Sequence, residues 1–212
     1  MAQELTKLTC ALVVTYEEDL TTALDVDVAR DLVSDPAAEV QILEGVPGRF
    51  AIVRSVRQQL ETVIEARKIT VSDKSAQSPA SEAFLSHGLN IIRYFGSPRM
   101  TAHGWNFEII SKTSDEGAGP SVARAFLSDA AKVALSLSGR LQSASVQIVY
   151  ELKDVQYTLV VQPRSQKPGS AELLAQLNAH YATGLPGDDT SVRLEMTTTF
   201  EELGRFLQKV LG

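Results

Sequence analysis

Two short segments that combine histidine, asparagine and an aromatic residue are the best candidates for chemistry in this sequence. The candidate ligand or partner face consists of His103, Trp105, Asn106, Asn178, His180 and Tyr181. A histidine can act as a general base when an acid lies within hydrogen-bond reach, and Glu108 or Asp188 could supply that acid. The key question is therefore whether the two segments converge in one cavity.

Each of these residues also has an ordinary structural interpretation. Plain core packing is the favoured role for Trp105 and Phe107, because large aromatic side chains dominate protein interiors. The third histidine, His87, lies in a predicted helix with no second ligand three or four residues away. It is therefore predicted to be a half-buried packing residue and not a metal ligand.

The sequence contains none of the common enzyme motifs. It has no phosphate-binding loop, no dinucleotide-binding glycine pattern, no nucleophile elbow, no HExxH and no pair of cysteines. The doublet Asp25 and Asp27 lacks the further oxygen ligands that a metal needs, which favours a solvated helix face. An enzyme is thus the less favoured hypothesis, and no cofactor, metal or catalytic residue is expected.

Composition limits the classes of partner. The 212 residues carry a net charge of −6, which argues against nucleic acid because phosphate binding depends on clustered Lys and Arg. The basic stretch from Arg49 to Lys68 is interpreted as a solvated sheet edge, since Arg54 and Arg57 would face opposite sides of a strand. The N-terminal segment is too short and too polar for a signal peptide or membrane span. With Cys10 as the only cysteine, predicted to be a small buried residue, a cytoplasmic location is expected.

The clearest structural pattern is the ribbon Ala144–Pro163, in which apolar and polar residues alternate on both sides of Leu152-Lys153-Asp154. Side chains in a strand point to opposite faces at every second residue, so this pattern predicts two antiparallel strands with one buried face. Further strands are predicted at Thr6–Tyr16, three or four times between Glu39 and Lys74 with a turn at residues 45–48, at Arg99–Lys112, and at Val192–Met196.

Helices are predicted between these strands from apolar residues at helical spacing. Their ranges are Glu17–Ser34, a segment capped by Ser78 and Pro79 that runs to Phe95, Ser121–Leu137, and a final helix that starts at a capping box around Thr199. Residues Ala171–Ala182 are ambiguous, because their composition favours a helix while their alternation favours a strand. Both alternatives remain open at this level.

Together these patterns predict an α+β fold in which mainly antiparallel sheet is covered on one side by three to four amphipathic helices. We expect a single domain over residues 1–212, with an internal pseudo-duplication into halves 1–137 and 138–212 as a further hypothesis. The leading functional hypothesis is a non-enzymatic protein-binding or assembly module that binds another protein or its own copy. The alternative is a small-molecule-binding domain or hydrolase-like enzyme with a pocket between sheet and helices.

Overall fold

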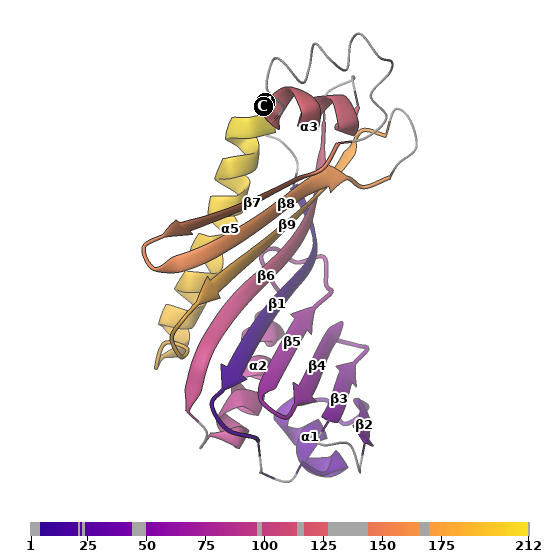
Figure 1. Cartoon of the computed structure of the whole chain (residues 1–212). Coiled ribbons are helices and arrows are strands. Elements are labelled where there is room, and N and C mark those ends of the chain that lie inside the picture. Colours follow the sequence, from indigo (N-terminus) through magenta and orange to yellow (C-terminus); the bar gives the residue numbers. More distant parts are fainter. Residues whose placement is uncertain are drawn as a thin grey trace.

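The fold is an antiparallel sheet of nine strands with helices packed against it, which confirms the predicted α+β class. A computed structural model describes residues 5–20, 22, 24–43, 50–96, 99–113, 117–126, 144–165 and 170–211. The strands follow the order β2-β3-β4-β5-β1-β6-β9-β8-β7, and every neighbouring pair is antiparallel. The long strands β1 and β6 thus lie side by side in the middle of the sheet (Figure 1).

The strands agree closely with the alternating stretches of the sequence. They are β1 (Leu5–Tyr16), β2 (Glu39–Leu43), β3 (Phe50–Ser55), β4 (Leu60–Glu65), β5 (Lys68–Asp73), β6 (Met100–Lys112), β7 (Val146–Leu152), β8 (Val155–Pro163) and β9 (Glu172–Tyr181). Every second residue of β4, β5 and β9 is buried over most of the strand, as the two-residue repeat of a half-buried sheet requires. The ambiguous segment 171–182 is therefore a strand.

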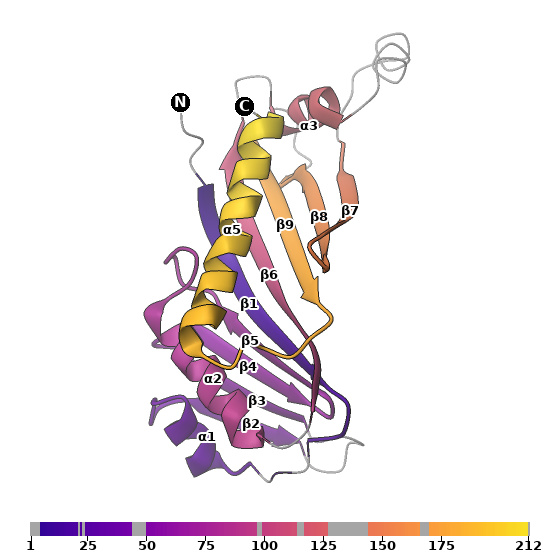
Figure 2. The same ribbon diagram turned by 90° about the vertical axis from the view of Figure 1, so that its left-hand side faces the viewer.

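The helices lie on one face of this sheet. They are α1 (Val26–Leu32), α2 (Glu82–Phe95), α3 (Ala118–Phe126) and α5 (Asp189–Leu211). The two long helices, α2 and α5, cross the same face, with α1 beside α2 and α3 near the end of α5 (Figure 2). None of the described helices is long and apolar enough to span a membrane. One side of the sheet is thus covered, and the other carries no described helix.

The ribbon 144–163 folds as its sequence predicts. Lys153 and Asp154 link β7 to β8 and have φ values of 53° and 64°. Two consecutive residues with positive φ make the type I′ turn, whose twist matches that of the flanking strands. Both this ribbon and the strands between Glu39 and Asp73 belong to the same sheet.

The predicted start of the first helix is wrong. The helix predicted from Glu17 begins only at Val26, where the Asp25 carboxylate caps it by accepting the N–H of Val28. The preceding segment is held instead by backbone bonds, including Leu20 N–H to the Ala66 carbonyl at 2.7 Å. An amphipathic pattern alone could not reveal these tertiary partners.

The start of α2 lies after the predicted Ser78 and Pro79, with Ser81 as its N-cap residue. The Ser81 side chain makes no capping bond; its N–H is bound by the carboxylate of Asp73 at the end of β5. Asp73 also accepts a 3.0 Å bond from the Lys7 ammonium, in an ion pair whose side chains are fully buried. The carboxylate of Asp73, which belongs to a strand and not to the helix, thus fixes the start of α2.

The strand predicted at Val192–Met196 is wrong, because these residues belong to α5. The Asp188 carboxylate accepts the N–H of Ser191, which starts the helix about ten residues before the predicted capping box. Val192 and Met196 are both buried, one helical turn apart. Together with Leu194, which is 66% exposed, they recur at every second residue, and this repeat resembles a strand only over a short window.

Some predictions fall outside the described residues. These are the turn at residues 45–48, the part of the predicted helix Ser121–Leu137 beyond Phe126, and the boundary between residues 137 and 138. The pseudo-duplication and its halves therefore stay a prediction.

Candidate functional site

The two candidate segments lie side by side in the structure. Strands β6 and β9 pair so that His103 faces Tyr181, Asn106 faces Asn178, and Gly104 faces His180. Because successive side chains alternate between the two faces of a sheet, this register divides the six predicted residues into two groups. Asn106, Asn178 and His180 lie on the face without helices, whereas His103, Trp105 and Tyr181 lie beneath α5.

On the face without helices, the first group surrounds a shallow depression of about 130 Å³. Its lining residues are Val13, Thr15, Ala102, His103, Gly104, Asn106, Asn178 and His180. Asn178 and His180 are exposed, and Asn106 is half-buried. These three residues therefore do not line a pocket between the sheet and the helices, where the alternative functional hypothesis had placed them.

Gly104 forms the floor of the depression for a geometric reason. A Cβ atom at this position would come within 2.8 Å of the Ala179 carbonyl oxygen on the neighbouring strand. That approach is closer than van der Waals contact allows, so a side chain here would push β6 and β9 apart. The glycine thus leaves space between Val13 and His180, which also line the depression.

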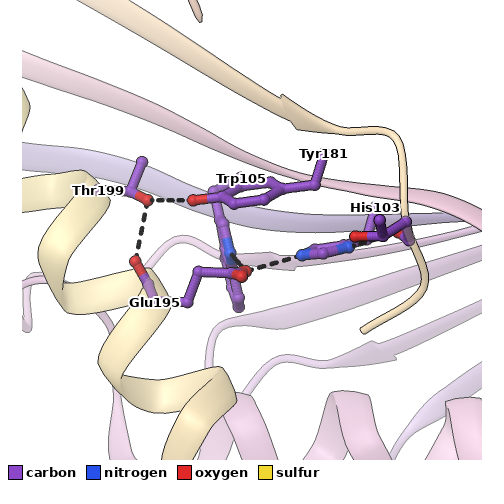
Figure 3. Close-up of polar contacts among 6 residues, drawn as sticks. His103, Trp105, Tyr181, Glu195 and Thr199 are labelled. Atoms are coloured by element: carbon purple, nitrogen blue, oxygen red, sulfur yellow. Dashed lines mark hydrogen bonds and ion pairs between the residues drawn. The ribbon is translucent and has the colours of Figure 1, made fainter. Parts of the chain in front are cut away.

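Beneath α5, the second group joins two residues of the helix in a buried polar network, which we call the α5 cluster: His103, Trp105, Tyr181, Glu195 and Thr199 (Figure 3). Glu195 Oε1 lies 2.7 Å from His103 Nε2 and accepts the indole N–H of Trp105, also at 2.7 Å. The Trp105 side chain is fully buried, as predicted for a core residue. One carboxylate oxygen therefore ties α5 to two residues of β6.

The hydrogen-bond partners of His103 determine how many protons the pair holds. His103 Nδ1 lies 2.8 Å from the Thr183 carbonyl, which can only accept, so Nδ1 carries a proton. The contact between Nε2 and Glu195 then needs one more proton, on either the imidazole or the carboxyl group. The pair as a whole is neutral in both cases, which suits its burial.

Tyr181 completes the α5 cluster. Its ring stacks on that of His103, with centroids 4.6 Å apart and planes 12° apart. Thr199 Oγ1 donates to the backbone carbonyl of Glu195 at 2.9 Å, so at 3.0 Å it accepts the hydroxyl proton of Tyr181. Burial raises the pKa of Tyr181 well above its usual value, which keeps the phenol a neutral donor.

Two further hydrogen-bonded pairs, which we call the α2 cluster, are Ser55 with Asp35 and Thr62 with His87 of α2. Thr62 Oγ1 lies 2.7 Å from His87 Nε2, and Ser55 Oγ donates to Asp35 at 2.6 Å. His87 Nδ1 is buried and has no hydrogen-bond partner among the described residues. Burial lowers the pKa of His87 to about 4, although the nearby Asp35 opposes the shift. The bond from Ser55 lowers the pKa of Asp35. His87 is thus a packing residue, as predicted, and is more deeply buried than expected.

The predicted burial of Cys10 is confirmed, since the residue is 0% exposed and burial raises the pKa of its thiol. Within the described parts of the chain, no group of three or more His, Cys, Asp or Glu residues could hold a metal ion.

Sequence reasoning missed Glu195, Thr199 and Gly104. Glu195 and Thr199 stand one helical turn apart, but the first was assigned to a strand and the second to a cap, so their shared helix face was not considered. A glycine inside a strand often marks a close backbone approach, and this was the available signal for Gly104.

The sheet face without helices is poor in charge at its centre. We define the helix-free face by the outward residues in the middle of β1, β6 and β9: Thr9, Ala11, Val13, Thr15, Ala102, Gly104, Asn106, Glu108, Ile110, Leu174, Gln176, Asn178 and His180. Glu108 is the only Asp, Glu, Lys or Arg in this set, and it accepts bonds from Thr9 at 3.3 Å and Gln176 at 2.6 Å. Lys112 and Glu172, which pair with each other, lie on the same side of the sheet beyond the end of this set. No protein-family model matches this chain, and no curated protein matches it either.

Proposed function

We propose that this protein is a non-enzymatic protein-binding or assembly module that receives a protein partner, or a copy of itself, on the helix-free face. The observation that carries the proposal is the near absence of charge in the middle of strands β1, β6 and β9. Interface centres are depleted of charged residues relative to the rest of a protein surface, since desolvating charge is costly. Here 46 of 212 residues are charged, yet only Glu108 belongs to the helix-free face, and the next charged pair, Lys112 and Glu172, lies at the end of β6 and β9.

The depression at Gly104 supports the same function. Asn106 and Asn178 can each donate and accept hydrogen bonds, and His180 can do so through its ring nitrogens. Polar groups that line a hollow can fix the orientation of an inserted group. The depression therefore suits one polar side chain of a protein partner.

Small-molecule binding at the same place is the second candidate, and the convergence of Asn106, Asn178 and His180 on one depression favours it. Its volume of about 130 Å³ is, however, smaller than the roughly 300–1,000 Å³ of ordinary ligand pockets. Size thus favours the protein partner. We do not propose nucleic acid as the partner, because the protein is acidic. A cytoplasmic location, which we infer from the single cysteine, is part of the proposal.

The test compares proteins captured by immobilised wild-type chain and by Asn178→Lys. Asn178 is exposed on β9, so the lysine places a charge on the helix-free face without disturbing the core. Leu194→Lys is the matched control, because Leu194 is exposed on α5 at the opposite side of the sheet. We expect at least one protein to bind wild type and the control equally but not Asn178→Lys. Identical capture by all three chains would contradict the proposal.

A further inference from the structure

The edge strand β7 provides one well-defined route to self-association. It is the last strand of the sheet, so one side of its backbone has no strand partner among the described residues (Figure 1). An edge of this kind is a template for another strand unless it is protected by shortness, a bulge, proline or lysine. Strand β7 has seven residues, contains no proline or lysine, and pairs with β8 without a register shift.

The β7–β8 turn determines which backbone groups of β7 face outward. Leu152 and Val155 flank the two-residue turn, so they form a hydrogen-bonded pair, and such pairs alternate with non-bonded ones along an antiparallel ribbon. Leu152, Tyr150, Ile148 and Val146 therefore bond to β8. The N–H and C=O groups of Gln147, Val149 and Glu151 point away from the sheet, where no described strand bonds to them.

We propose that two copies of this chain pair through β7 in antiparallel register about a two-fold axis at Val149. This inference rests on the proposed role as a self-associating module and names the surface used. Val149 is the middle residue of β7, so only this register pairs the strand over its whole length. Val146 of each copy then lies opposite Leu152 of the other copy. All three outward residues then meet as hydrogen-bonded pairs.

Side-chain chemistry favours the same register. Val149 is 57% exposed and Leu152 is 47% exposed, and pairing of the two copies covers both apolar side chains. Glu151, the only charged residue of β7, stands opposite Gln147 of the second copy and can accept a bond from its amide. A register with its axis at Glu151 would instead bring two carboxylates together, which matters for a chain with a net charge of −6.

The consequence is a continuous sheet of eighteen strands, nine from each copy. The two-fold axis runs perpendicular to the sheet, so the helices of both copies lie on one side and both helix-free faces lie on the other. The dimer thus doubles the charge-poor surface that the proposed function uses.

The first experiment is sedimentation velocity over a range of protein concentrations, with wild type, Val149→Lys and Val149→Thr. Wild type is expected to form a dimer. Two lysines at the axis should raise the dimer dissociation constant by about a hundredfold, because like charges directly opposite each other repel. Val149→Thr keeps the branched shape and strand propensity and should dimerise almost as well as wild type.

Cysteine cross-linking tests the register. Opposed Cα atoms of a hydrogen-bonded pair are about 5.5 Å apart, within the range of a disulfide. Val149→Cys should therefore cross-link to its own copy under mild oxidation, while Gln147→Cys and Glu151→Cys should cross-link only when mixed with each other. The native Cys10 is buried and does not compete.

The outcomes separate this inference from the proposed function. A wild-type dimer that is unaffected by Val149→Lys and is not cross-linked at Val149 would overturn the edge pairing but leave self-association intact. A wild type that stays monomeric at all concentrations would overturn the edge pairing and self-association together. Partner binding on the helix-free face is then still decided by the capture experiment with Asn178→Lys.

Discussion

The two buried histidines of this protein occupy similar positions but have different partners. His87 lies under α2 and is 3% exposed, while His103 lies under α5 and is 2% exposed. His87 contacts only the Thr62 hydroxyl through one nitrogen, and its other nitrogen has no partner among the described residues. His103 contacts a carbonyl and a carboxylate, so both of its nitrogens are satisfied.

The difference shows that partners, and not burial alone, determine what a buried histidine does. His87 is buried without a charged hydrogen-bond partner and therefore stays neutral. It packs between α2 and β4 and contacts Thr62 of that strand. The proton shared by His103 and Glu195 makes the other histidine part of a structural link between β6 and α5. The two regions should therefore respond differently to substitution and to pH.

Removing the carboxylate from the α5 cluster should have the largest effect. Glu195→Ala leaves His103 Nε2 and the Trp105 N–H buried without their partner, and we expect it to lower the free energy of unfolding by about 4 kcal/mol. Urea denaturation at pH 7 measures this loss. Glu201→Ala, at an exposed position of the same helix, is the control and should change stability by less than about 0.5 kcal/mol. Equal effects of the two substitutions would show that the cluster does not hold α5.

Acid should act mainly through the α2 cluster. The pKa of His87 is about 4 in the folded protein and about 6.5 in the unfolded chain, so between these values only the unfolded chain binds the proton. Stability is therefore highest above pH 6.5 and falls by about 3 kcal/mol as the pH drops toward 4.

The measurement is urea denaturation of wild type and His87→Gln at several pH values between 7.5 and 4. Glutamine can still bond to Thr62 but does not titrate, so the variant should lose less stability on acidification. The surface carboxylates are the same in both proteins, so their contribution to the pH dependence of stability cancels in the comparison. Parallel pH profiles would contradict a neutral, buried His87.

The smallest effect is expected at the edge of the α5 cluster. Tyr181→Phe removes one hydroxyl, but Thr199 keeps its bond to the Glu195 carbonyl and the ring can still stack on His103. We expect a loss of about 1 kcal/mol, the net value of one hydrogen bond, with no change in the pH profile. Thermal unfolding at pH 7 and pH 5 would detect either effect, and a loss as large as that of Glu195→Ala would assign Tyr181 a central role.

Local patterns predicted the parts of the site that depend on one segment. The alternation in Arg99–Lys112 placed His103, Trp105 and Phe107 on one face and Asn106 and Glu108 on the other, as the β6 pairings confirm. The sequence could not reveal that Asn106 and Asn178 are direct neighbours, because pairing of β6 with β9 has no local signature. It also missed Glu195, since Val192, Leu194 and Met196 have the two-residue repeat of a strand over that short window.

The sequence by itself determined the α+β class, the β7–β8 ribbon with its turn at Lys153 and Asp154, and the two-sided character of the strands. Each depends on side-chain alternation or turn geometry among adjacent residues, so it is encoded locally. Only the tertiary structure decided which face the helices cover, and therefore which candidate residues are buried with Glu195 and which face the solvent. That choice depends on contacts between residues about 90 positions apart, which are selected by the burial of the whole core.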